Sequence, residues 1–235
     1  MTRLLAVLLL LASSSVSAVI IQIDYTGTVG STVPAGLTSS FSVGDAVTGS
    51  LRYDTDGAFV SNVLGNGAGI TRGYNALVSF EISIGAYTVS SSGGGVFVAD
   101  GNAGNALAPK DSVTFAAYGL NSPLGLNQTL SENFSVGASP SRLQFQLLSA
   151  ANATVLPDAS LPSLATTTSF IAANTSGTST NLVVFEGAGL IRYNLSSVSA
   201  SVVTTPAPAS ALLMLVPAMW LVGVGARRRN RAASA

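Results

Sequence analysis

The sequence has no cysteine and no histidine, a single lysine and a single tryptophan, and only 9% of its 235 residues are charged. Without cysteine there are no disulfides, thiolate nucleophiles or thiolate-ligated metals. Without histidine, Ser–His–Asp and Cys–His catalysis is excluded, together with metal sites built on imidazole. Lys110 leaves a Ser–Lys dyad open, but the segment Ala108-Pro109-Lys110-Asp111 is typical of a solvated turn. We expect no cofactor.

The formal net charge is zero, yet the two signs are distributed unevenly. Half of the basic residues lie in the end segments: Arg3, Arg227, Arg228, Arg229 and Arg231. Between about Val19 and Pro208 the chain therefore carries five basic and ten acidic residues, a balance of −5. Binding to a phosphate backbone requires clustered Lys and Arg. We expect no nucleic-acid partner.

Residues 1–18 are typical of a secretory signal peptide. Arg3 gives the positive start, Leu4–Ala12 is apolar, and Val16-Ser17-Ala18 supplies the small residues that signal peptidase requires. We predict cleavage between Ala18 and Val19 after the export translocon has carried the chain across the inner membrane. An uncleaved helical anchor is the alternative, but the apolar run is too short to cross a bilayer.

The C-terminal segment, residues 205–235, has three parts. Pro206-Ala207-Pro208 is followed by an apolar run over 209–226 and then by the arginines of 227–231. At 1.5 Å per residue, this run covers roughly 27 Å, which suffices for a single transmembrane helix. The arginines should stay cytoplasmic, leaving the rest of the chain outside. The simplest interpretation is a permanent membrane anchor.

A Pro-x-Pro signature, a short transmembrane helix and a terminal arginine cluster together resemble the PEP-CTERM sorting signal. The signal residues are Pro206, Ala207, Pro208, Arg227, Arg228, Arg229 and Arg231, and Ala207 replaces the central Glu of the family. The resemblance implies handling by an exosortase, a membrane transpeptidase-like enzyme of bacteria that make exopolysaccharide. It also implies a location at the cell surface or outside the cell. The anchor would then be transient.

Residues 19–204 alternate between apolar and polar side chains in many short segments, which predicts half-buried strands. The clearest are 21–26, 47–54, 78–84, 113–115, 142–147 and 191–196; shorter candidates are 87–89, 96–98, 182–185 and 198–202. No segment of helical length shows a clear 3.6-residue period. We predict an all-β antiparallel domain, with a jelly-roll-like β-sandwich as the first choice and a closed barrel as the second. The segment Phe41–Asp54 also resembles the opening of many PEP-CTERM proteins.

The ten acidic residues are the remaining candidates for chemistry: Asp24, Asp45, Asp54, Asp56, Glu81, Asp100, Asp111, Glu132, Asp158 and Glu186. A glycosidase needs two carboxylates across a groove. No spacing singles out such a pair, although Glu81 should face solvent or a groove and Glu186 ends a strand. Asp54-Thr55-Asp56-Gly57 allows calcium binding, but an Asx-type turn is the preferred interpretation.

Three functions follow from these observations. The first is an exported structural protein of the cell surface or of an exopolysaccharide or biofilm matrix, which is not an enzyme. The second is a lectin-like glycan-binding module, with calcium at Asp54 and Asp56. The third is a carboxylate-dependent glycan hydrolase.

Overall fold

The computed structural model describes residues 19–30, 32–64, 70–100, 111–149, 155–173 and 181–203. The chain divides into two units, Met1–Val203 and Thr204–Ala235, and all described residues belong to the first. This first unit consists mainly of antiparallel strands, which confirms the predicted all-β class.

Ten strands are present in the described part of the chain, together with one 3₁₀ helix and one α-helix. The first strands are β1 (Ile20–Val29), β2 (Ala46–Leu64), β3 (Ile70–Ile84), β4 (Tyr87–Ser91) and β5 (Gly94–Asp100). They are followed by β6 (Ser112–Tyr118), β7 (Leu130–Glu132), β8 (Pro140–Leu148), β9 (Leu182–Phe185) and β10 (Gly189–Val203). The helices are η1 (Ala35–Leu37) and α2 (Leu164–Ala173).

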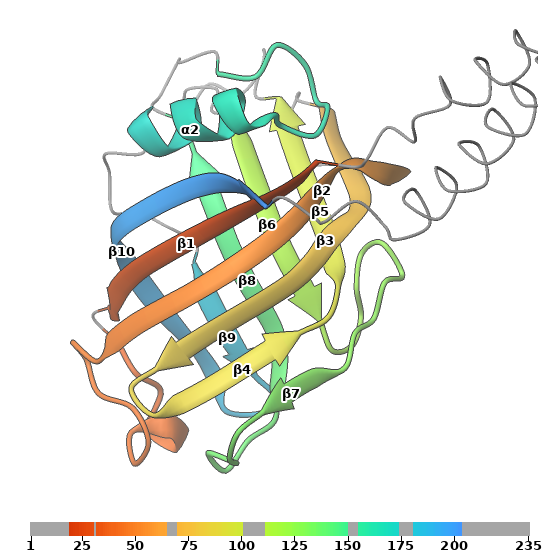
Figure 1. Ribbon diagram of the computed structural model, residues 1–235. Coiled ribbons are helices and arrows are strands. Elements are labelled where there is room, and N and C mark those ends of the chain that lie inside the picture. Colours follow the sequence, from red (N-terminus) through yellow and green to blue (C-terminus); the bar gives the residue numbers. More distant parts are fainter. Residues whose placement is uncertain are drawn as a thin grey trace, which may run out of the picture. The chain divides into compact units, whose positions relative to one another are not determined.

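All ten strands belong to one sheet in the order β2-β1-β10-β9-β8-β6-β5-β3-β4-β7. Since β2 also pairs with β3, eight of the strands close into a ring, and β4 and β7 extend from β3 outside it. Figure 1 shows the result as two layers. The front layer contains β10, β1, β2, β3, β4 and β7, and the back layer contains β9, β8, β6 and β5.

The alternating segments predicted a sandwich of two separate sheets, and the difference has a clear cause. Two long strands change partners along their length, and one of them, β3, also pairs with β2. The N-terminal half of β3 pairs with β5 and its C-terminal half with β4. Likewise, β10 pairs with β9 near its start and with β1 over the rest of its length. These shared strands carry the hydrogen bonding from one layer to the other, so the sheet closes as in the second of the two predicted alternatives.

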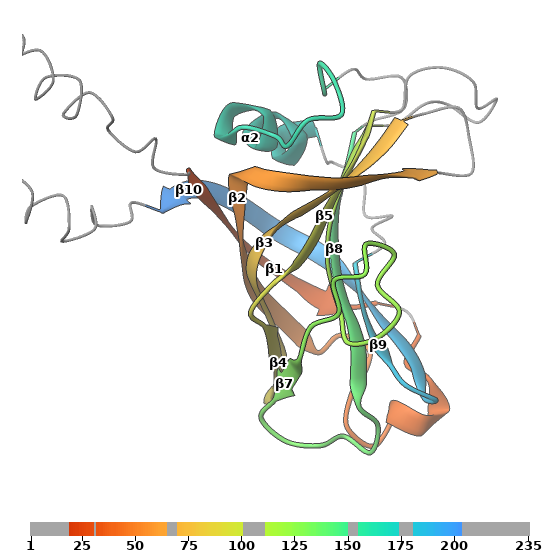
Figure 2. The same ribbon diagram turned by 90° about the vertical axis from the view of Figure 1, so that its right-hand side faces the viewer.

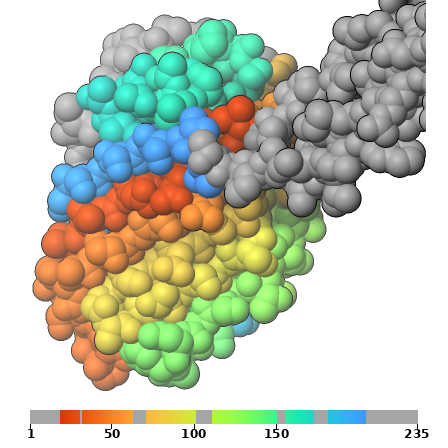
Figure 3. Space-filling model, viewed as in Figure 1, coloured from red at the N-terminus to blue at the C-terminus, as the bar shows by residue number. Residues whose placement is uncertain are grey.

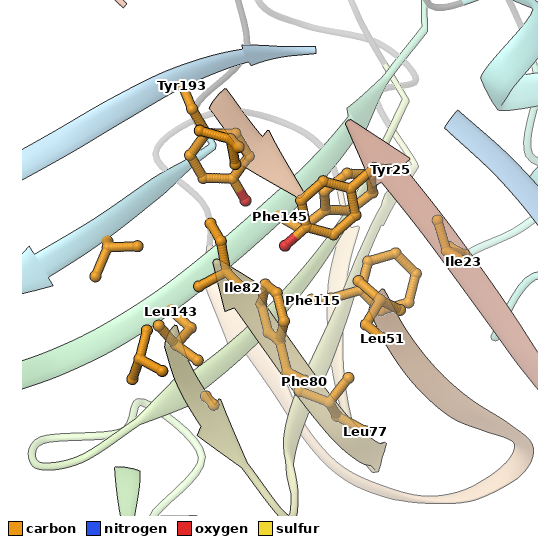
Figure 4. Close-up of a cluster of buried hydrophobic side chains, with 14 of the residues drawn as sticks. Ile23, Tyr25, Leu51, Leu77, Phe80, Ile82, Phe115, Leu143, Phe145 and Tyr193 are labelled. Atoms are coloured by element: carbon orange, nitrogen blue, oxygen red, sulfur yellow. The ribbon is translucent and has the colours of Figure 1, made fainter. Parts of the chain in front are cut away.

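The core lies between the two layers and is built by the predicted alternation of side chains. Ile21, Ile23 and Tyr25 of β1 are buried, whereas Asp24 and Thr26 between them are exposed. Figure 4 shows apolar side chains from both layers meeting in the interior. Tyr25 stacks on Phe145 of β8 with ring centroids 4.7 Å apart, which joins the front layer to the back layer. Burying each such side chain stabilises the fold by about 1.5–3 kcal/mol.

The helix α2 was not predicted, and it lies across one end of the two layers (Figures 1 and 2). Its sequence contains a run of three threonines, which lose side-chain freedom in a helix. Tertiary contacts compensate: Phe170 is fully buried, and Tyr53 of β2 shares a hydrogen bond of 2.6 Å with Thr167. Within the described ranges, no helix has the length and apolar character needed to cross a membrane.

Candidate functional site

The outer side of the front layer is lined by rows of small polar side chains that run across the strands. One row consists of hydroxyl residues only: Ser197, Thr26, Thr48, Ser83 and Thr88. The next row contains Ser199, Asp24, Ser50, Glu81, Ser90 and Ser131. A third contains Ser201, Gln22, Arg52 and Ser79. We call these fifteen residues the hydroxyl face.

The hydroxyl face follows from local sequence. Each strand that contributes to it places apolar residues on the inner side and Ser, Thr or charged residues at the positions between them. Antiparallel pairing in register then aligns these positions from strand to strand. Neighbouring hydroxyl positions are about 4.8 Å apart across the strands, and successive rows are about 7 Å apart along them. Figure 3 shows β10, β1, β2, β3 and β4 side by side on this surface.

Seven of the fifteen side chains on this face are hydrogen-bonded to one another, and the other eight are not. Thr26 and Ser197 share one of 2.8 Å, as do Ser83 and Thr88. The Arg52 guanidinium donates to the Gln22 side-chain oxygen at 2.8 Å, and the Gln22 amide in turn donates to Asp24. Hydroxyls such as those of Thr48 and Ser50 remain able to donate to and accept from a ligand.

Charge on the hydroxyl face is low and nearly balanced. Asp24 and Glu81 are its acidic residues and Arg52 its basic residue. Asp24 and Glu81 share a row with Ser50 between them, so their backbones are about 10 Å apart. Both are exposed on an open surface, in agreement with the prediction that Glu81 faces outward. A glycosidase needs its two carboxyl groups on either side of the scissile bond, and this pair lies side by side on one face.

Several of the other acids hold the backbone of their own loops. The Asp45 carboxylate accepts the Ser42 amide at 2.7 Å, and the Asp158 carboxylate accepts the Ser160 amide at 2.8 Å. Hydrogen bonds from the side chain and the backbone of Ser160 hold the pKa of Asp158 below its usual value. These two carboxylates therefore stabilise the conformation of their loops. Glu186 lies directly after β9, as predicted, and is exposed.

The predicted solvated turn around Asp111 is wrong for that residue. Asp111 is 3% exposed, and one of its carboxylate oxygens accepts the amides of Val155 and Leu156 at 2.7 and 2.9 Å. Its own amide donates to the Ser149 hydroxyl at 2.9 Å. The carboxylate thus fixes a loop more than forty residues further along the chain, a contact that local sequence does not reveal. Lys110, the candidate for a Ser–Lys dyad, lies outside the described residues.

Glu132 of β7 has a hydrogen-bond partner in the core between the two layers. The buried Tyr87 hydroxyl donates to the Glu132 carboxylate at 2.9 Å. The pKa of Tyr87 is raised well above its usual value, mainly by burial and to a smaller extent by this carboxylate. The contact attaches the short strand β7 to β4, which again is a structural role.

The candidate calcium loop at residues 54–57 forms an Asx turn, which was the preferred interpretation. The Asp56 amide donates to Asp54 Oδ1 at 2.8 Å, which is an Asx turn. The predicted strand ended at residue 54, but β2 continues past this turn. Residues 54–57 form a bulge in the pairing of β2 with β3. Among the residues that the structure describes, no group of three or more acidic, His or Cys side chains could hold a metal ion.

The predicted targeting residues fall almost entirely outside the described part of the chain. This holds for Ala18, for Pro206, Ala207 and Pro208, for the 209–226 segment, and for Arg227, Arg228, Arg229 and Arg231. Val19 is the first described residue, and its carbonyl accepts the Thr55 amide at 3.1 Å. The hydroxyl face, by contrast, was not predicted. Its signal was the recurrence of Ser and Thr at the outer strand positions, but the register that aligns them is a property of the folded sheet.

No protein-family model matches this chain, and comparisons with curated proteins and with solved structures likewise return no match.

Proposed function

We propose that this chain is an exported structural protein of the cell surface or extracellular matrix, and that its hydroxyl face contacts exopolysaccharide. The hydroxyl face is the observation that carries the proposal. The sorting signal at residues 205–235 would keep the precursor in the membrane until an exosortase-like enzyme processes it. The domain itself would perform no catalysis.

Chemical complementarity supports this choice of partner. A polysaccharide presents hydroxyl groups at regular intervals, and each can donate and accept a hydrogen bond. The hydroxyl face offers the same chemistry at regular spacings of about 4.8 Å and 7 Å. Its low charge does not favour a polyanion such as nucleic acid. A single exposed hydrogen bond contributes only about 0.5–1.5 kcal/mol, so useful affinity requires many contacts along one chain.

The first test is co-sedimentation of the exported protein with exopolysaccharide isolated from the producing cell. The variant carries Thr26→Val, Thr48→Val and Ser50→Ala, which remove three central hydroxyls while keeping residues of similar size. The matched control carries Ser112→Ala and Thr114→Val on β6 of the back layer, where both side chains are partly exposed. We expect the first variant to bind at least about tenfold more weakly and the control to bind like the wild type.

Equal binding by the wild type and the hydroxyl-face variant would refute the role of this face. Two further arms separate the alternatives. Binding that is lost on chelation would favour a calcium-dependent lectin using Asp54 and Asp56. Release of new reducing ends from the polysaccharide would favour a hydrolase.

A further inference from the structure

The C-terminal part of β2 forms an open edge of the sheet. The pairing of β1 with β2 ends at Ile20 and Asp54, and beyond it the Thr55 amide still donates to Val19. From Ala58 to Leu64, β2 pairs with β3 along one side. Along its other side, no strand of the described part of the chain pairs with it. This segment, 58–64, is called the β2 edge.

The β2 edge lacks most of the features that usually keep sheet edges from pairing with other chains. Natural edges carry charged side chains, proline or β-bulges, or have very few residues, and of these the β2 edge has only a bulge. The chain has no charged residue between Asp56 and Arg72 and no proline in the β2 edge. Phe59 is 54% exposed and Val60 is 39% exposed, which is high for side chains of this size. A register shift between Phe59 and Ser61 bends the strand without adding charge.

The other open end of the sheet shows the contrast. There, β7 is three residues long and includes Glu132. It is followed by Asn133, whose side chain accepts the Thr88 amide at 2.8 Å and so ends the pairing with β4. One edge of the sheet is thus short and charged, whereas the β2 edge is longer, uncharged and apolar.

Whether the N-terminal segment covers the β2 edge depends on signal-peptide cleavage. If signal peptidase cuts before Val19, as the sequence predicts, no residue precedes Val19 that could lengthen β1 alongside Ala58. An unpaired backbone row with exposed apolar side chains is the usual acceptor for an added strand. Because the segment carries no charge, two copies of it meet without repulsion between like charges.

We propose that the β2 edge is a self-association surface, where residues 58–64 of two copies pair antiparallel across a twofold axis. Such a contact is closed, since each copy offers the same segment to the other. It joins the two sheets through backbone hydrogen bonds and buries Phe59 and Val60 from both copies. The contact lies apart from the hydroxyl face, so it neither requires nor excludes binding to polysaccharide.

The absence of cysteine allows a direct test on the exported protein. A single Ser61→Cys substitution introduces the chain's one thiol into the β2 edge, and mild oxidation should then give a disulfide-linked dimer at micromolar concentration. Val43→Cys, at a residue that is 58% exposed in the turn before β2, is the matched control and should stay monomeric. Equal cross-linking of the two variants would overturn the proposal.

Sedimentation equilibrium of cysteine-free protein provides the second measurement. Val60→Lys should raise the dimer dissociation constant at least about tenfold relative to the wild type, whereas Val43→Lys should leave it unchanged. Circular dichroism would verify that both variants are folded. A wild-type protein that stays monomeric up to about 100 µM would contradict the proposal. In that monomer, protection from hydrogen exchange of the 58–64 amides that point away from β3 would show that another segment of the same chain covers the edge.

Discussion

Raising the pH above 10 should weaken the fold sharply because Tyr25, Tyr53 and Tyr193, in addition to Tyr87, have hydroxyls that are buried in it. Burial is the main cause that raises the pKa of Tyr25, of Tyr53 and of Tyr193 well above the ordinary value. Tyr53 donates to the Pro162 carbonyl at 3.0 Å, and Tyr193 donates to the Gln144 carbonyl at 3.1 Å. These hydroxyls keep their protons in the folded state at a pH where an unfolded tyrosine loses its own.

The sign and size of the effect follow from proton linkage. Above the unfolded pKa of about 10, the unfolded chain binds fewer protons than the folded one, so stability falls as the pH rises. At pH 11 each of Tyr25, Tyr53 and Tyr193 contributes a loss of about 1.4 kcal/mol, which gives about 4 kcal/mol for these three, and Tyr87 adds a further, smaller loss. Below pH 10 this contribution to stability is fully present.

The assay is urea unfolding of the purified protein, followed by circular dichroism at pH 8 and pH 11. The single lysine of the chain keeps competing alkaline titration small. Tyr53→Phe should lose about 1.4 kcal/mol less than the wild type over this interval. Recovery of the pH 8 signal after neutralisation controls for irreversible damage. A fall of less than about 1 kcal/mol in the wild type would refute the buried, neutral state of these hydroxyls.

Two substitutions test the packing of the fold by the same urea unfolding at pH 8. Asp111→Ala should cost about 3 kcal/mol because it leaves the Val155 and Leu156 amides without their carboxylate acceptor, whereas Glu186→Ala at an exposed position should change stability by less than about 0.5 kcal/mol. Equal effects would show that the Asp111 contacts contribute nothing. Gly49→Ala should cost about 2–3 kcal/mol, since its methyl group would meet the Tyr25 ring and lie 2.7 Å from the Glu81 carbonyl oxygen, while Gly36→Ala, with no contact nearer than 3.7 Å, should be close to neutral. A neutral Gly49→Ala would contradict the close packing of β2 against Tyr25.

The strands were predictable because alternation of apolar and polar residues within a short segment indicates both a strand and the side that is buried. The alternation at 21–26, for example, gave both the strand and the side that faces the core. In 78–84 it gave the strand and the buried side from Phe80 to Ile84, but Val78 is 43% exposed because the register with β2 shifts there. Two expectations about strand boundaries failed: the segments 191–196 and 198–202 form one strand, β10, and β2 continues past residue 54 to Leu64. The short β7 and the threonine-rich α2 were missed, because tertiary contacts hold them in place.

Closure of the sheet and the hydroxyl face depend on register, which is not a local property of the sequence. β3 can join two layers only because its two halves find different partners, and a period of two residues says nothing about which strand pairs with which. The same holds for Asp111, whose partners lie more than forty residues away. The Asp54–Asp56 turn was predictable because its hydrogen bond spans two residues.

The intact mass of the protein recovered from outside the cell tests the central claim of export and processing most directly. We predict a mature species that begins at Val19 and lacks Arg227, Arg228, Arg229 and Arg231, and whose C-terminal trimming disappears when the exosortase-like enzyme is deleted. A product that starts at Met1 and still carries the arginine cluster, or one found with both ends intact in the cytosol, would contradict it.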